Sequence, residues 1–234
     1  MMRLAVPKRV LCSLVARQLK NMFVLHRAEL GLLNSSVAEA LRSSEACFQA
    51  SLVKSFRRNG DAFFDPFHSG QYCIFLYWLS CVLGRSSYTR ALATRVYLLN
   101  KALHGCDLYY EVQLPRIFSL DHPVGTVLGR AAYSDYFFFV QNCTVGNNRG
   151  RYPVFEERVS LLAGAMVLGN SHIGQNCIIS ARTLVKDADI PPNSLVFGES
   201  PNLVIKSRPR AYFDRYFSGI WNLDYNRNSM DPPR

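Results

Sequence analysis

A six-residue period in the last third of the chain constrains its fold more than any other feature. A large apolar residue recurs at every sixth position, and a small or β-branched residue follows four positions later. Neither a helix, with period 3.6, nor a two-faced strand, with period 2, produces this pattern. A parallel β-helix does, because each hexapeptide forms one flat side of a coil and sends one apolar side chain inward. The large series is Phe155, Leu161, Val167, Ile173, Ile179 and Val185, and the small series is Val159, Ala165, Ser171, Cys177 and Thr183.

The first half of the chain has a different residue pattern, which is typical of helices. Apolar residues between Leu30 and Leu52 repeat at helical spacing. The segment 57–60, Arg-Arg-Asn-Gly, predicts the end of that helix with a C-cap glycine. We expect a second helix from an N-cap at Ser69 to about Leu83, and a third over 88–103.

These patterns predict an α+β fold with a helical domain over residues 1–105, coils over 106–206 and a C-terminal extension over 207–234. The period is less regular before residue 150. Leu128 with Ala132, and Phe139 with Cys143, look like inward pairs, and a one-residue slip is expected within 133–138. Residues 229–234 are expected to be frayed.

Composition narrows the class of partner. The net charge of +10 favours anionic partners in general, such as a phosphate-bearing cofactor. The basic residues are scattered and no nucleic-acid-binding signature occurs, so we expect no nucleic-acid partner. Seven cysteines, an odd number without a C-x-x-C pair, indicate a reduced chain without structural zinc. The scattered histidines likewise predict no metal site.

The chain carries no obvious targeting or membrane-spanning segment. Basic residues interrupt the apolar N-terminus, which argues against a signal peptide. The longest apolar run, 72–83, is shorter than the roughly 20 residues of a membrane-spanning helix. We therefore expect a cytoplasmic protein. Residues 3–20 favour a helix packed on protein, with a membrane-surface helix as the alternative.

One histidine lies in a context that suits catalysis. His122 follows Asp121 and precedes Pro-Val-Gly at the end of an apolar stretch. A histidine is the natural general base near neutral pH, and an adjacent acid can orient it. A histidine next to an aspartate can equally be just hydrogen-bonded.

Several segments together resemble the hexapeptide-repeat, left-handed β-helix acyltransferases, and among them the serine O-acetyltransferases. The match covers about residues 106–206, where the segments keep the family's order and spacing. The helical half matches more loosely through Asp65-Pro66. The segments that carry the resemblance are 120–129, 140–146, 151–153, 162–170, 190–193 and 196–201.

The resemblance implies a homotrimer, or a dimer of trimers, with acetyl-CoA in the groove between neighbouring coils. It implies that His122 is the catalytic base, with Asp121 as the adjacent acid. Glu111 is the nearest candidate for a second orienting acid, and Asp65 matches a residue that holds the acceptor. For the pantetheine arm of acetyl-CoA the resemblance implies the backbone around Ala163, Gly164 and Ala181. On charge alone, Lys186, Lys206 and Arg208 are candidates for the CoA phosphates, although a solvated surface explains them equally well.

The sequence departs from the serine acetyltransferases at the acceptor site. Tyr152 stands where that family has a second histidine before the proline, while Arg151 keeps the adjacent basic residue. The glycine-rich loop before it is also shortened. Three readings remain open. They are an acetyl-CoA-dependent O-acetyltransferase acting on serine or a related small acceptor, a sugar acetyltransferase of surface-polysaccharide synthesis, and a β-helix scaffold without activity.

Overall fold

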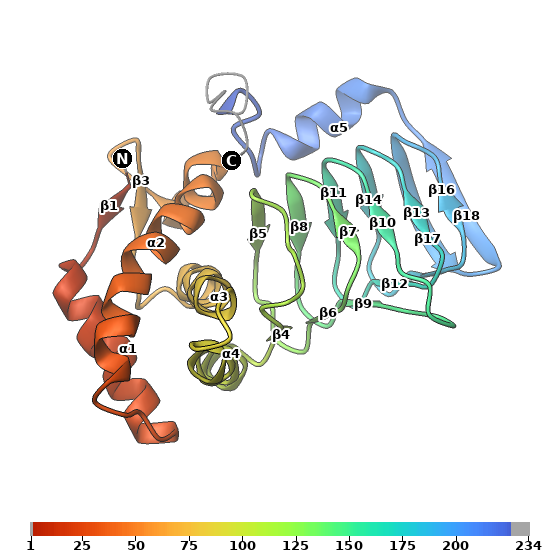
Figure 1. Cartoon of the computed structure of the whole chain (residues 1–234). Helices are drawn as coiled ribbons and strands as arrows, with labels where there is room; N and C mark the ends of the chain where they lie inside the picture. The colour runs from red at the N-terminus through yellow and green to blue at the C-terminus, as the bar shows by residue number, and fades with distance from the viewer. Residues whose placement is uncertain (1, 226–234) are drawn as a thin grey trace.

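The computed structural model describes residues 2–225, in which a helical part lies beside a stack of parallel coils (Figure 1). The helices α1 to α4 end at His104, and the first strand of the coils begins at Asp107. The predicted α+β order, helices followed by a parallel β-helix, is confirmed. Both parts share one continuous apolar core, so the coils and helices are not independent in packing.

The helical part is built around α3, which is apolar on nearly all sides and therefore buried. α2 and α4 pack against it, and α1 buries one face against α2. That contact favours the reading of α1 as a helix packed on its own protein. The elements are β1 (Arg3–Leu4), α1 (Lys8–Met22), α2 (Glu29–Ala50), η1 (Lys54–Phe56), β2 (Arg57–Arg58), β3 (Asp61–Phe64), α3 (Ser69–Gly84) and α4 (Arg90–His104).

The helix end predicted at residues 57–60 is wrong. α2 stops at Ala50, and these residues form the hairpin between β2 and β3. Asn59 and Gly60 both have positive φ, 55° and 85°, which is the tight turn that an Asn-Gly pair favours between antiparallel strands. The predicted cap at Ser69 is wrong by one residue, because His68 caps α3. The predicted C-terminal ends of α3 and α4 are confirmed to within one residue, whereas α4 begins two residues later than predicted.

The coils have three flat faces, here called A, B and C, each made of strands stacked in parallel register. Face A holds β7 (Ala132–Tyr133), β10 (Val154–Phe155), β13 (His172–Ile173) and β16 (Asp189–Ile190). Face B holds β5 (Phe118–Leu120), β8 (Phe137–Phe139), β11 (Val159–Leu161), β14 (Cys177–Ile179) and the start of β17 (Ser194–Glu199). Face C holds β4 (Asp107–Leu108), β6 (Val127–Leu128), β9 (Thr144–Gly146), β12 (Met166–Leu168) and β15 (Leu184–Lys186).

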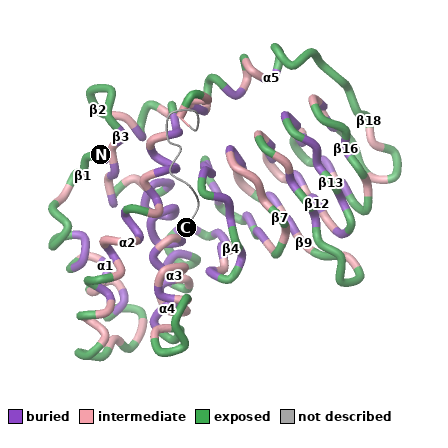
Figure 2. Tube along the Cα trace, turned by 45° about the horizontal axis from the view of Figure 1, so that its top comes forward, coloured by how far each residue is buried: buried purple, intermediate pink, exposed green. Residues whose placement is uncertain are grey.

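The predicted six-residue series is confirmed. Every residue of the large and small series, from Phe155 to Val185, is at most 2% exposed. Figure 2, in which the tube is coloured by burial, shows buried and more exposed segments alternating along the coils. The predicted inward pair of Phe139 and Cys143 is also confirmed, since both are fully buried.

The slip in the period lies earlier than predicted. Leu128 stacks on Val145 and Tyr133 on Phe155, so the shortened link joins Leu128 to Tyr133. Ala132 is therefore exposed, and its assignment as an inward residue is wrong. The tight link depends on Gly129, where a Cβ would lie 2.6 Å from the backbone oxygen of Val145.

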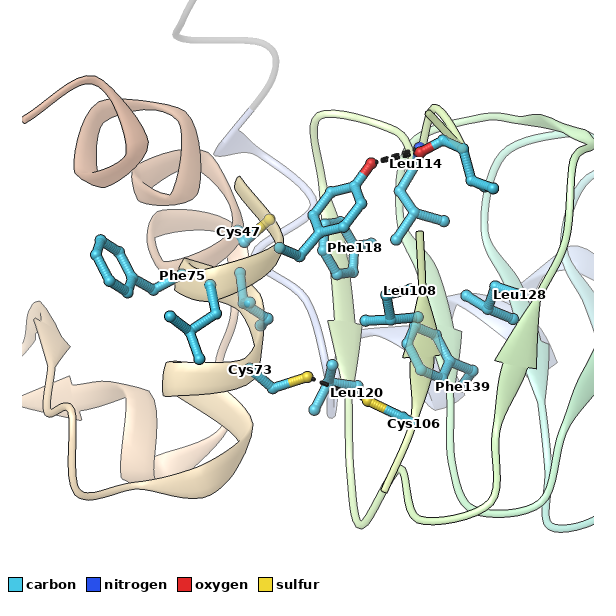
Figure 3. Packing of buried hydrophobic residues seen from close by; sticks show 14 of the residues in the cluster. Cys47, Cys73, Phe75, Cys106, Leu108, Leu114, Phe118, Leu120, Leu128 and Phe139 are labelled. Carbon is cyan, nitrogen blue, oxygen red and sulfur yellow. Dashed lines mark hydrogen bonds between the residues drawn. The ribbon is translucent and has the colours of Figure 1, made fainter. Parts of the chain in front are cut away.

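The helical part closes one end of the β-helix interior. Figure 3 shows side chains of α3 facing the first coil. They cover Leu108, Phe118 and Leu120, which would otherwise be exposed to solvent. The Tyr77 hydroxyl donates to the Val112 carbonyl at 2.8 Å and accepts from the Leu114 amide at 2.9 Å. These hydrogen bonds satisfy the backbone groups of Val112 and Leu114 in the segment that enters the first coil.

The C-terminal segment returns from the far end of the coils to the helical part. β17 turns back into β18 (Asn202–Ser207), and α5 (Arg210–Phe217) then runs along the coils towards α2 (Figure 1). We call residues 209–225 the C-terminal strap. They belong to the predicted extension over 207–234, whereas the predicted frayed residues 229–234 lie outside the described chain. Within residues 2–225, no helix is both long and apolar enough to span a bilayer.

The strap is fixed at its end by aromatic side chains and by backbone hydrogen bonds. Phe213, Phe217 and Trp221 are buried in a second apolar cluster, against Ala46 and Ala50 of α2 and against the outer surface of face B. The Leu52 amide donates to the Ile220 carbonyl at 2.8 Å, and the Asn222 amide donates to the Ala50 carbonyl at 2.7 Å. The strap therefore positions Ile220 beside the loop that follows α2.

Candidate active site

His122 lies in the loop between β5 and β6, at the edge where face B meets face C. It has a positive φ of 46°, and its side chain is 84% exposed. The loop is held on both sides, because the Asp121 amide donates to the Phe139 carbonyl at 3.1 Å and the Gly125 amide donates to the Gly105 carbonyl at 2.8 Å. The His122 Nε2 lies 3.5 Å from Asp121 Oδ1. This fixed backbone presents an accessible imidazole beside a carboxylate.

His122 and Asp121 line a cavity of about 330 Å³ between the first coil and the helical part. The cavity is formed by five segments that are far apart in the sequence: the loop after α2, the start of α3, the loop of His122, β8 and the strap. Its walls combine apolar side chains with hydroxyl, imidazole and carboxylate groups. The other lining residues are Val53, Ser55, Phe56, His68, Ser69, Gly70, Leu120, Phe138 and Ile220.

The sequence did not point to His68 or Ile220 as site residues. His68 comes just before α3, and Ile220 comes from the strap, so only the folded chain brings them to His122. The predicted acceptor residue Asp65 lies three positions before His68. Its Oδ1 accepts from the Phe67 amide at 2.9 Å, and its backbone amide donates to the Gln71 side chain. Asp65 thus shapes the turn that presents His68.

The residues predicted for the pantetheine arm lie on the same edge as His122. The Asn142 amide donates to the Val124 carbonyl at 2.9 Å, and the Gly164 amide donates to the Gln141 carbonyl at 3.0 Å. The Arg182 amide then donates to the Ala163 carbonyl at 2.9 Å, which brings Ala181 onto the next coil of the stack. With coils about 4.8 Å apart, this edge runs about 14 Å from the level of His122 to that of Ala181.

Arg151 and Tyr152 lie on a different edge, where face C meets face A. Both are exposed, in the loop between β9 and β10, and neither lines the cavity of His122 in the same chain. Asp187 anchors this loop by accepting from the Asn148 side chain and, at 2.8 Å, from the Asn170 amide. These hydrogen bonds, led by that of the Asn170 amide, lower the pKa of Asp187 below its ordinary value.

The three basic residues proposed for the CoA phosphates are not gathered at one place. Lys206 is the nearest to the His122 edge, since its Nζ lies 5.5 Å from the ring centroid of Phe197, which continues that edge on the last coil. Lys186 lies at the Arg151 edge beside Asp187. The Arg208 amide donates to the Asn193 carbonyl, which places Arg208 at the third edge. Arg182, which the sequence did not single out, lies exposed on the His122 edge next to Ala181.

Glu111 does not contact His122. Its Oε2 accepts from Arg130 at 3.1 Å, and both side chains are partly exposed. An orienting role for Glu111 therefore stays a prediction without a contact to support it. Within residues 2–225, no three His, Cys, Asp or Glu side chains are grouped as metal ligands, and all seven cysteines are free thiols.

Comparison with known proteins gives one consistent resemblance. No family model matches the chain. The serine acetyltransferase of Synechococcus elongatus is 32% identical over 118 residues, which are 48% of each chain. The crystal structure of Neisseria gonorrhoeae serine acetyltransferase has a TM-score of 0.67 at 23% identity, over 88% of this chain and 82% of that one. The serine acetyltransferase of Brucella abortus in complex with coenzyme A has a TM-score of 0.63 at 20% identity, over 87% of this chain and 83% of that one.

These similarities establish the architecture. The chain has the left-handed β-helix fold of serine acetyltransferases, with the helical part in the same place, and the predicted fold is confirmed. In sequence, the chain spans about half the length of the curated relatives that it matches.

Proposed function

We propose that the protein is an acetyl-CoA-dependent O-acetyltransferase acting on serine or a similar small acceptor. The observation that carries the proposal is the position of His122. It stands where the coil edge that bears Ala163, Gly164 and Ala181 meets the cavity between the first coil and the helical part. An extended donor along the edge would bring its thioester to the mouth of a chamber that holds the acceptor. The resemblance to serine acetyltransferases, one of them bound to coenzyme A, supports this donor.

In this mechanism the imidazole of His122 removes the proton from the acceptor hydroxyl as the oxygen attacks the thioester carbonyl. The tetrahedral intermediate collapses, the C–S bond breaks, and His122 returns the proton to the thiolate of CoA. Asp121, 3.5 Å from Nε2, stabilises the imidazolium that forms in between. Base catalysis of this kind contributes about 10²–10⁴-fold, and orientation of the two substrates contributes much of the rest.

The cavity favours a small acceptor. At about 330 Å³ it is at the lower end of the roughly 300–1,000 Å³ range of ligand pockets. A molecule of the size of an amino acid fits inside, whereas a nucleotide sugar would have to leave most of its atoms outside. This favours serine or a related hydroxy compound over the sugar acceptors of polysaccharide synthesis. The cavity beside His122 also favours an enzyme over an inactive scaffold.

We further propose a homotrimer formed through face C. This face separates the His122 edge from the Arg151 edge, and its outward side chains Val127, Met166, Leu168 and Leu184 remain partly exposed. Packing face C against the next copy would bring Arg151 and Tyr152 of one chain towards His122 of another. Such a site would be incomplete in one chain. Pairing of trimers and a cytoplasmic location stay predictions.

The oligomer is tested by light scattering after gel filtration. Met166→Glu places a charge in the proposed interface and is expected to yield monomers. Ala132→Glu, on the exposed side of face A, is the matched control and should leave the trimer intact. A monomeric wild-type protein, or a Met166→Glu trimer, would contradict the proposal.

The activity is tested by thiol release from acetyl-CoA with L-serine and with a panel of sugars and nucleotide sugars. His122→Ala should lower turnover by at least about 100-fold. His172→Ala is the matched control, because His172 lies exposed on face A in an ion pair with Glu156. Full activity in His122→Ala would show that His122 is not the base. Turnover of sugars but not of L-serine would show that the acceptor is a sugar.

A further inference from the structure

We propose that His68 is an acceptor-binding residue, which holds an oxygen atom of the acceptor while His122 removes the hydroxyl proton. The inference rests on the proposed function and names a residue that binds the acceptor in the same site. It comes from the cavity, where His68 and His122 are the two imidazoles that face a common space. The two side chains approach from different parts of the fold, one from the start of α3 and one from the first coil.

The orientation of the His68 ring is fixed on two sides. Its Nδ1 accepts a hydrogen bond from the Gln71 amide at 3.3 Å, which caps α3. The ring also packs edge-on against Phe56, with centroids 5.6 Å apart and planes at 90°. Phe56 itself is 2% exposed and belongs to the main core. A side chain held in this way loses little further freedom when it binds a ligand.

The hydrogen bond at Nδ1 determines which nitrogen faces the cavity as a donor. A neutral imidazole that accepts at Nδ1 carries its hydrogen on Nε2. Among residues 2–225, no hydrogen bond or ion pair engages Nε2 of His68. A ligand that covered the Nε2–H group without accepting a hydrogen bond from it would leave a buried donor unpaired, which is costly. The cavity therefore favours a ligand with an oxygen atom that accepts from Nε2.

The composition of the cavity makes this donor important. No lysine or arginine lines it within the described chain, and its apolar walls come from Val53, Phe56, Leu120, Phe138 and Ile220. The other polar side chains at its wall, besides those of the catalytic pair, are the hydroxyls of Ser55 and Ser69. A small acceptor with a hydroxyl and a second oxygen group, such as the carboxylate of L-serine, fits both imidazoles at once. This arrangement positions the hydroxyl towards His122.

The test separates binding from capping by using two variants of His68. His68→Asn keeps an N-cap acceptor for the Gln71 amide, since asparagine is among the favoured capping residues. Its side chain is shorter than that of histidine, so its amide NH2 group does not reach the position from which Nε2 donates into the cavity. His68→Ala removes both the N-cap acceptor and the donor. We expect the KM for L-serine to rise about tenfold in both variants, the scale of one lost hydrogen bond, with the KM for acetyl-CoA unchanged. Calorimetry should show the same tenfold loss in the Kd of L-serine.

The measurements test the role of His68 whether or not the protein catalyses acetyl transfer to L-serine. If His68→Asn restores wild-type KM and Kd for L-serine, His68 only caps the helix and the proposal is overturned. If the wild-type protein binds L-serine without releasing thiol, the proposed function fails, and the Kd of the two variants still decides the role of His68. If the wild-type protein does not bind L-serine, the assignment of this cavity to the acceptor is overturned. His122→Ala should keep the Kd within about threefold, because its role is proton transfer.

Discussion

The strap is expected to open when its terminal aromatic anchor is removed. Trp221 is 1% exposed and lies 5.6 Å from Tyr136, centroid to centroid, at an interplanar angle of 77°. Truncation of a buried tryptophan to alanine costs about 3–5 kcal/mol. The anchors Phe213, Phe217 and Trp221 together contribute about 5–9 kcal/mol by burial, and ordering the strap costs a large part of this. Trp221→Ala therefore removes most of what keeps the strap closed.

Limited proteolysis measures this opening directly. Trypsin sites at Arg210 and Arg215 lie on α5, and cleavage there follows the population of the open strap. A loss of about 3 kcal/mol raises that population about 100-fold, so the cleavage rate of Trp221→Ala should rise by about that factor. The same variant should show a higher KM for the acceptor, because Ile220 leaves the cavity wall.

Two controls test the reasoning. Tyr212→Ala removes an aromatic ring from the same helix, but Tyr212 is 46% exposed and its loss should change cleavage less than about threefold. Trp221→Phe should retain most of the protection, since the indole Nε1 is buried without a hydrogen-bond partner in residues 2–225. Unchanged cleavage of Trp221→Ala would refute the anchoring role. If the strap of Trp221→Ala opened only at the denaturant concentration at which the whole protein unfolds, the strap would not open separately and the reasoning would be refuted.

Two further predictions concern the loops of the coil edges. Gly125→Ala should lower turnover about tenfold, because a φ of +78° strains an alanine in the His122 loop and its Cβ would lie 2.1 Å from Asn142 Oδ1, so that the Asn142 side chain must turn away. Gly60→Ala has the same positive-φ strain with open space around the Cβ and should only lower stability by about 1–2 kcal/mol. Equal activity in both variants would argue against an effect of the Asn142 contact on the His122 loop. The lowered pKa of Asp187 contributes stability that is present at neutral pH and is lost as pH falls below its ordinary value of 3.8. Asp187→Asn should therefore flatten the acid limb of the urea-midpoint profile, and an unchanged profile would contradict the anchor.

The β-helix was predictable because its inward positions follow directly from the period. Each hexad contributes one large side chain, and Leu161 stacks on Ile179 and Val167 on Val185 of the next coil without any information from outside the repeat. The period does not specify links between faces. The five-residue link from Leu128 to Tyr133 depends on the close approach at Gly129, which only neighbouring coils define. The helix end predicted at Asn59-Gly60 was wrong for another reason. An Asn-Gly pair also favours a tight turn between strands, and here it forms that turn with both residues at positive φ.

The site was predictable only in part, and the reason is physical. The edge proposed for the donor belongs to the repeat, so His122 and Ala163 could be placed on it from spacing and resemblance. The cavity proposed for the acceptor is instead built in large part by segments that lie outside the repeat, among them Phe56, His68 and Ile220. These residues are separated by up to 164 positions from one another and share no local pattern.

This division has a consequence for specificity. The coils provide a continuous edge whose backbone is the same from one hexad to the next, and such an edge suits the long donor that many members of a fold share. In the proposed site the acceptor faces α3, the loop after α2 and the strap, none of which repeats. Changes in the acceptor are therefore expected to follow substitutions at His68, Val53 or Ile220 rather than in the coils. Exchange of these three side chains should alter the acceptor KM while the acetyl-CoA KM stays constant, and a shift of both together would place the acceptor on the coil edge instead.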